Sequence, residues 1–363
     1  MSLTSGSELL ISGIGLLASG DAGAPRLDAD RLVIRDGRIA AIGAAATPSN
    51  EARVTDADGG VVLPGLWDAY HVLAFGDHEP VLDAHGYLAR TATCGTTTVV
   101  STGPLALPGR PRDARGAVSL AILSARSWAY EHPGGITAHG GTLIAVPGLT
   151  AADLRSAADA GVRRLSIAEP FADRDEAVRC VALARDHGFF VMADCGHGSL
   201  IDRSGARSAL ALIRPDLAAC VNGPVPLADA DVAWLLDEAG GHLGLTPTGS
   251  LSSATRVVAA ATARRALARL VITTRTPDAG TILPDGVGRL LAFLAALPEV
   301  GPEAAIAIGS GNVARAYGTT GGRIAVGEPA DMLVFNGSAA LAALADGVWR
   351  APDMVLVAGD VVG

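Results

Sequence analysis

Polar side chains suited to acid–base chemistry directly follow several short segments of this chain that are typical of buried β-strands. Glu169, Asp194 and Arg275 each stand at the end of such a segment, and Tyr70 stands near the end of another. A carboxylate there can act as a general acid or base, and a guanidinium or a phenol can stabilise negative charge on an oxygen. We therefore predict that Glu169 and Asp194 are an acid–base pair, assisted by Tyr70 and Arg275.

Further polar side chains and thiols lie beside these positions. Cys195 and His197 follow Asp194 closely, and Cys220 lies within another apolar segment. A cysteine near a histidine can be a nucleophile, but a free cysteine is more often a small buried side chain, so nucleophilic catalysis is the lesser alternative. The candidates for substrate binding are His71, His139, Cys195, His197, Cys220 and Asp278.

The middle of the chain alternates strand and helix patterns. Residues 175–187 form an amphipathic helical pattern that stops at Gly188, and the strand-like segment 189–193 follows it. Thr150 is the expected N-cap of an earlier helix. Repeated strand–helix units predict a parallel sheet that closes as a (β/α)8 TIM-type barrel over residues 61–321, with its active site at the carboxyl ends of the strands. On an ideal strand, His71 would point away from Tyr70, so it reaches such a site only through a bulge.

The two ends of the chain carry a different pattern. Residues 32–34 and 39–43 read as strands joined by a tight turn at Asp36-Gly37, and short strands recur after residue 322. The economical interpretation is a small β-sandwich domain made of residues 1–60 and 322–363. The predicted fold class is therefore α/β, a barrel inserted into a domain built from both termini.

Composition limits the kinds of partner. The chain has 363 residues and a net charge of −9, without a dense basic cluster, which argues against nucleic acid. The apolar segment 9–17 lacks a basic flank and contains Ser and Gly, so it reads as a strand and no membrane association is expected. The four cysteines lack zinc-ribbon spacing, which favours a reduced, cytoplasmic protein. A small-molecule substrate is the expected partner, and a homo-oligomer is left open.

Two motifs carry a resemblance to a known family. The segments Pro64-Gly65-Leu66-Trp67-Asp68 and Gly327-Glu328-Pro329-Ala330-Asp331 resemble the opening and closing motifs of the amidohydrolase superfamily. Among its subgroups the chain is most similar to enamidases, which hydrolyse a cyclic enamide in nicotinate breakdown. The supporting segments include His139-Gly140-Gly141 and Asn222-Gly223-Pro224. The resemblance implies a catalytic barrel and a metal centre at the strand ends.

The resemblance also places the family's metal ligands on this chain. They fall, in order, on Tyr70, Val72, Glu169, Asp194, Cys220 and Arg275. Only Glu169 keeps a residue of the expected type, and an arginine at the last position opposes a cation electrostatically. We therefore expect no metal and no other cofactor.

Three functional hypotheses follow. The first is a metal-independent enzyme that uses acid–base catalysis on a small cyclic amide, ester or carbonyl compound, by cyclisation, dehydration, isomerisation or hydrolysis, in specialised biosynthesis. The second is a non-catalytic protein that binds a ligand. The third is a metal-dependent hydrolase of cyclic amides with atypical ligands such as Glu169, Asp194 and Cys220.

Overall fold

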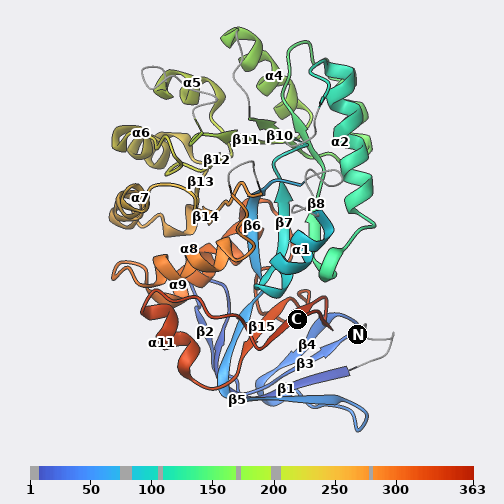
Figure 1. Ribbon diagram of the computed structural model, residues 1–363, viewed down its shortest axis with the longest axis vertical. Coiled ribbons are helices and arrows are strands. Elements are labelled where there is room, and N and C mark those ends of the chain that lie inside the picture. Colours follow the sequence, from blue (N-terminus) through green and yellow to red (C-terminus); the bar gives the residue numbers. More distant parts are fainter. Residues whose placement is uncertain (1–7, 74–83, 105–108, 169–172, 198–205, 278–280) are drawn as a thin grey trace.

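The computed structural model describes residues 8–73, 84–104, 109–168, 173–197, 206–277 and 281–363. The barrel strands with their surrounding helices lie at one end of the molecule, and a β-domain lies at the other (Figure 1). No helix in these ranges is long and apolar enough to cross a membrane.

The β-domain is one mixed sheet that combines strands from both ends of the chain. Its order is β17-β16-β15-β5-β1-β3-β4, with β2 paired to β1. The strands expected to form a sandwich thus belong to one hydrogen-bonded sheet. The domain boundaries near residues 60 and 322 stay a prediction, and β5 runs past the first of them. The strands are β1 Glu8–Ala18, β2 Arg26–Leu27, β3 Leu32–Arg35, β4 Arg38–Ile42, β5 Arg53–Pro64, β15 Met332–Phe335, β16 Met354–Val357 and β17 Asp360–Val361.

The barrel strands are parallel and form two ladders, β6-β7-β8 and β9-β10-β11-β12-β13-β14. In the described residues the ladder is interrupted between β8 and β9 and between β14 and β6, so the sheet is not a continuous ring. The expected alternation of strand and helix is confirmed. The strands are β6 Leu66–His71, β7 Thr96–Ser101, β8 Thr137–His139, β9 Thr142–Ile144, β10 Arg164–Ile167, β11 Phe190–Asp194, β12 Leu217–Ala219, β13 His242–Leu245 and β14 Leu270–Ile272.

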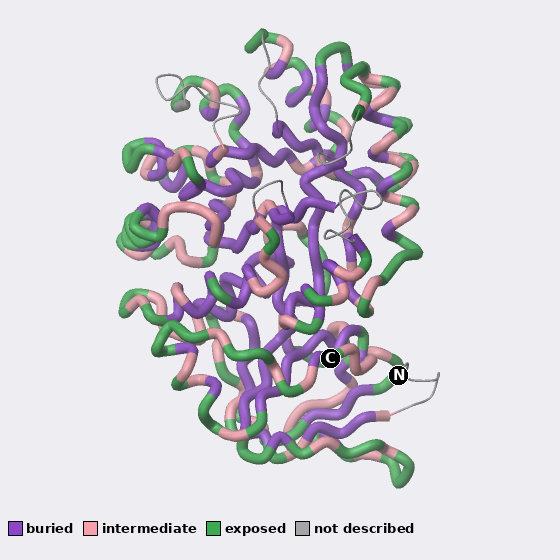
Figure 2. Tube along the Cα trace, viewed as in Figure 1, coloured by how far each residue is buried: buried purple, intermediate pink, exposed green. Residues whose placement is uncertain are grey.

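Helices surround the barrel strands. Thr150 caps α3 in a reciprocal capping box with Asp153, as the sequence predicts, and α4 covers nearly the predicted range. The helices bury their inner faces and expose their outer faces, while the barrel strands are mostly buried (Figure 2). They are α1 Ala84–Thr93, α2 Ala114–Trp128, α3 Ala151–Asp159, α4 Arg174–Asp186, α5 Ala206–Ile213, α6 Asp229–Trp234, α7 Leu251–Ala263, α8 Gly286–Ala295, α9 Gly301–Ile308 and α10 Gly311–Ala316. A further helix, α11 Ala339–Ala345, lies at the β-domain end, between β15 and β16 in the chain, and contacts β5, α8 and α9.

A buried carboxylate joins the first and last barrel strands across the gap between β14 and β6. Asp68 Oδ1 accepts hydrogen bonds from the backbone N–H groups of Thr274, at 2.9 Å, and Tyr70, at 3.1 Å. Its Oδ2 accepts from the Thr274 hydroxyl and from Nδ1 of His71, the latter at 2.8 Å. The backbone N–H of Arg275 then donates to the carbonyl of Tyr70 at 2.7 Å. Side-chain and backbone bonds therefore replace the missing ladder.

We expect Asp68→Ala to destabilise the fold. The backbone N–H groups of Thr274 and Tyr70 would lose their acceptor, and each buried donor left without an acceptor costs about 1–3 kcal/mol. The free energy of unfolding, measured by urea denaturation, should fall by about 3 kcal/mol or more. Asp186→Ala, at an exposed position, is the control and should change it by less than about 0.5 kcal/mol. Equal effects of the two substitutions would contradict this role.

Candidate active site

Asp194 is the centre of a polar cluster at the carboxyl ends of the barrel strands. It is the last residue of β11, and its side chain has 0% exposure. Its Oδ1 accepts a hydrogen bond from His197 Nδ1 at 2.9 Å, and its Oδ2 lies 2.7 Å from Arg275 Nε. A carboxylate buried so completely requires such a charged partner. Asp194 thus brings His197 and Arg275 together.

Tyr70 faces the same cluster from the end of β6. Its hydroxyl shares a hydrogen bond of 3.0 Å with Ser166 Oγ on β10. Burial raises the pKa of Tyr70 well above its usual value, and the charge of Asp194 adds to the effect. The phenol therefore keeps its proton near neutral pH and can donate a hydrogen bond.

Cys220 completes the cluster just beyond the end of β12. Its Sγ lies 3.7 Å from Thr273 Oγ1, and burial, reinforced by the charge of Asp194, raises the pKa of the thiol well above its usual value. The group therefore stays a neutral thiol, which is a poor nucleophile and a poor metal ligand. Cys220 and Arg275 both have left-handed backbone conformations, with φ of 56° and 53°, which are uncommon for residues other than glycine.

Two candidates from the sequence lie behind the barrel wall. His71 is buried, donates to Asp68 and stacks on Tyr87 of α1 with ring centroids 5.9 Å apart. The thiol of Cys195 contacts the carbonyl of Ala193 at 3.4 Å within the apolar layer between strands and helices. The structure does not bring either residue to the Asp194 cluster. Glu169 and Asp278 lie outside the described residues.

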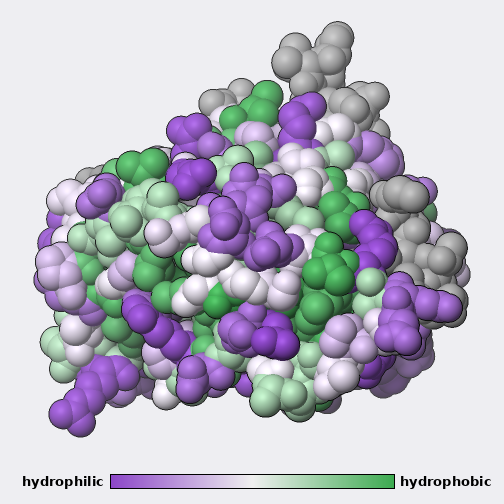
Figure 3. All heavy atoms as spheres, turned by 90° about the horizontal axis from the view of Figure 1, so that it is seen from below, coloured by the Kyte–Doolittle hydropathy of each residue, from purple (hydrophilic) through white to green (hydrophobic). Residues whose placement is uncertain are grey.

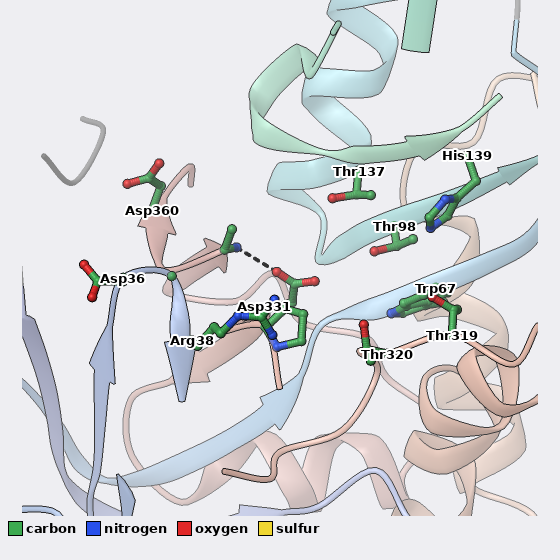
Figure 4. A pocket seen from close by; sticks show the side chains of 13 residues that line it. Asp36, Arg38, Trp67, Thr98, Thr137, His139, Thr319, Thr320, Asp331 and Asp360 are labelled. Atoms are coloured by element: carbon green, nitrogen blue, oxygen red, sulfur yellow. Dashed lines mark hydrogen bonds between the residues drawn. The ribbon is translucent and has the colours of Figure 1, made fainter. Parts of the chain in front are cut away.

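His139 lies at a different place, on the wall of a cavity of about 640 Å³ between the barrel and the β-domain (Figure 4). Trp67 and Thr137, near the amino-terminal ends of β6 and β8, also line this cavity, as does Asp331 of the β-domain. The barrel strands are parallel, so the cavity opens at the opposite end of the strands from Asp194. His139 is therefore separate from the polar cluster.

Sequence reasoning missed two residues that support the cluster. Ser166 was detectable, because it is a polar residue on one face of an apolar strand. Thr274 gave no such signal, because its partner Asp68 is 206 positions away in the sequence. Its contact depends on the meeting of the first and last barrel strands.

A parallel barrel with a polar cluster at the carboxyl ends of its strands defines an enzyme class whose sites lie at that end. The chain is 31% identical to an enamidase of Eubacterium barkeri over an alignment of 373 positions, which covers 98% of this chain and 95% of that protein. The crystal structure of an enamidase described as a member of the amidohydrolase superfamily gives a TM-score of 0.90 at 30% identity, over 98% of this chain and 96% of that one. The chain therefore belongs to the amidohydrolase superfamily, as a homologue of enamidase.

More distant structures share the fold. That of a D-hydantoinase gives a TM-score of 0.71 at 16% identity, over 98% of this chain and 95% of that one. No family model matches the sequence.

The described side chains do not fit the metal centre that this superfamily implies. Metal ligands must be deprotonated, and burial together with the charge of Asp194 raises the pKa values of Tyr70 and Cys220, so the loss of either proton would cost additional free energy. Asp194 Oδ2 already faces the cationic Arg275 at 2.7 Å, where a metal ion would be repelled. The chain also contains no lysine, so a carbamylated lysine cannot bridge two ions.

The cavity groups His139 and Asp331 have opposite effects on pH-dependent stability. Burial raises the pKa of Asp331 from 3.8 to about 6, whereas burial and the charge of Arg164 lower the pKa of His139 from 6.5 to about 4. Between pH 4 and 6 the folded protein therefore holds an extra proton on Asp331 and lacks one on His139, relative to the unfolded chain. As the pH rises, the contribution of Asp331 to the free energy of unfolding falls and that of His139 rises. The two contributions largely cancel.

We expect single substitutions to reveal these two contributions. In Asp331→Asn the free energy of unfolding should rise more steeply with pH than in the wild type between pH 4 and 6, by up to about 1.4 kcal/mol per pH unit. In His139→Gln the difference from the wild type should have the opposite sign. Denaturant titrations at several pH values measure both slopes. Equal slopes in all three proteins would contradict the assignment.

Proposed function

We propose that this chain is a hydrolase that opens a small cyclic amide by acid–base catalysis, with a guanidinium in the place where its superfamily uses a metal. The observation that carries the proposal is the 2.7 Å ion pair between Arg275 Nε and the buried Asp194 Oδ2 at the strand ends. The similarity to an enamidase supports the substrate class, because that name denotes hydrolysis of an enamide.

His197 is suited to be the general base. The carboxylate of Asp194 can only accept a hydrogen bond, so Nδ1 of His197 carries the proton and Nε2 has a free lone pair. The side chain of His197 is 15% exposed, whereas Asp194 is fully buried. Asp194 is thus a positioning residue that orients the imidazole and stabilises it when it is protonated, as in other carboxylate–histidine pairs.

The proposed reaction begins when His197 Nε2 removes a proton from water. The water oxygen bonds to the amide carbon, and the electron pair of the C=O bond moves to the oxygen, beside the Arg275 guanidinium. The oxyanion then reforms the carbonyl, the ring C–N bond breaks, and protonated His197 returns the proton to the leaving nitrogen. The neutral phenol of Tyr70 is available as a second hydrogen-bond donor.

The sequence suggests Glu169 and Asp194 as the acid–base pair, and this proposal gives Asp194 a different role. Both oxygens of Asp194 already face partners, so proton transfer is assigned to His197 instead. The part assigned to Glu169 stays a prediction.

A metal-dependent hydrolase is the second candidate function. One observation favours it: ligand atoms of Asp194, His197 and Cys220 lie within 4.8 Å of one another. This group differs from the predicted one in containing His197. The protonated thiol and the adjacent guanidinium weigh against it.

The proposal is tested by measuring ring opening with protein from which a chelator has removed any metal. The full chain is treated with a chelator until elemental analysis shows less than one zinc, iron or manganese per chain. We expect this protein to open members of a panel of five- and six-membered lactams and cyclic enamides. NMR follows the ring opening. His197→Gln should lower turnover by about 10²–10⁴-fold. The matched control is His187→Gln, because Nδ1 of His187 bonds only the carbonyl of Leu183 on α4.

The other outcomes separate the hypotheses. About one metal per chain, lost together with activity on chelation, would establish the metal-dependent function. A protein that binds panel compounds without turning any over would be the non-catalytic relative.

Arg275→Met should destabilise the protein by roughly 3–5 kcal/mol, because it leaves the carboxylate of Asp194 buried without its cationic partner. The double variant Arg275→Met/Asp194→Asn should recover most of this stability, because the amide is neutral and still offers an acceptor to His197. We expect the double variant to fold, as measured by thermal denaturation, yet to lose turnover by about a hundredfold or more. A stable and fully active double variant would remove Arg275 from the mechanism.

A further inference from the structure

The cavity between the barrel and the β-domain has the size of a small-molecule site. Its volume of about 640 Å³ lies within the range of about 300–1,000 Å³ that is usual for ligand pockets. On the outer surface at the β-domain end, by contrast, polar and apolar residues are interspersed (Figure 3). Its lining includes Trp67, Thr98, Thr137 and His139 of the barrel and Arg38 and Asp331 of the β-domain.

Trp67 offers the cavity a hydrogen-bond donor. Its side chain is almost completely buried, with 2% exposure of the residue, and Nε1 has no hydrogen-bond partner among the described residues. In Figure 4 this nitrogen points to the side of the cavity where Asp331 and Thr320 lie. A buried N–H without an acceptor costs about 1–3 kcal/mol, so a ligand carbonyl there would recover free energy.

Asp331 offers an acceptor on the facing wall. It is 7% exposed, and its Oδ1 accepts the backbone N–H of Ala358 at 2.7 Å. The second oxygen points away from that bond, toward the barrel side of the cavity (Figure 4). Because carboxylate oxygens accept N–H donors strongly in a site of low dielectric constant, this oxygen suits a ligand N–H.

The remaining lining indicates a planar and uncharged ligand. The rings of Trp67 and His139 lie 5.9 Å apart and inclined at 32°, which gives the cavity two aromatic side chains against which a planar ring can pack. Among the described residues that line the cavity are the carboxylates of Asp36, Asp331 and Asp360 and the guanidinium of Arg38. Nη1 of Arg38 already donates to the carbonyl of Gly327 at 2.8 Å. This excess of negative charge disfavours anions, and the threonine hydroxyls can either donate or accept.

We propose that this cavity is a second ligand site, separate from the Asp194 cluster, for a neutral planar nitrogen heterocycle that presents an N–H and a C=O on one edge. The ligand carbonyl accepts from Trp67 Nε1, the ligand N–H donates to Asp331, and the ring lies against the aromatic side chains. The proposal is independent of the function proposed above, because none of the residues that carry it belongs to the Asp194 cluster.

Uracil is the probe for the experiment, and its binding to the full chain is measured by calorimetry and saturation-transfer NMR. The wild type should bind uracil and should bind 1,3-dimethyluracil, which lacks the N–H groups, at least tenfold more weakly. Trp67→Phe keeps an aromatic ring but removes the donor, and it should also weaken uracil binding by about tenfold, the effect of one hydrogen bond. Unchanged thermal stability would show that this variant is folded.

Two controls locate the site. Trp128 is the matched control for Trp67, because Nε1 of Trp128 is also buried without a hydrogen-bond partner among the described residues. Unlike Trp67, Trp128 packs against residues of α1 and does not line the cavity. Trp128→Phe and His197→Gln should therefore bind uracil like the wild type. Absence of binding to the wild type, equal affinity of the Trp67 and Trp128 variants, or loss of binding in His197→Gln would each overturn the proposal.

Discussion

The carboxylate of Asp68 holds the first and last barrel strands together where their backbone ladder is missing. It accepts four hydrogen bonds, two from Thr274 on the far side of the gap and two from its own strand. These bonds place the carbonyl of Tyr70 against the N–H of Arg275, at 2.7 Å. The position of the guanidinium beside Asp194 therefore depends on how the barrel closes, and the site is a consequence of that closure.

Around Asp194, one buried charge determines the chemistry of its neighbours. The carboxylate requires the cation of Arg275, and its negative charge raises the pKa values of Tyr70 and Cys220 further than burial alone would. Among the described residues, the result is a site with an ion pair, a partly exposed imidazole and neutral hydroxyl and thiol groups. Such a set can transfer protons and stabilise an oxyanion.

The two ends of the barrel differ in electrostatic character. The carboxyl ends carry an ion pair, whereas the cavity at the other end is lined by aromatic rings, threonine hydroxyls, the guanidinium of Arg38 and three carboxyl groups, of which that of Asp331 has its pKa raised by burial to about 6. The cavity exists because the β-domain, assembled from both ends of the chain, packs across the start of the barrel strands. The same packing buries Asp331 and Trp67, whose polar atoms favour a ligand between the two layers.

The sequence alone determined the features that depend on neighbouring residues: the helix cap at Thr150, the alternation of strand and helix, and the place of Asp194 at a strand end. It placed Arg275 at the same edge of the barrel as Glu169 and Asp194, because parallel strands bring their carboxyl ends together, but it did not decide which carboxylate pairs with Arg275. Tertiary structure decided on which side of the barrel wall each side chain lies. His71 and Cys195 point outward, and His139 lies at the far end, because alternation along a strand and register between strands are fixed by pairing across long sequence distances.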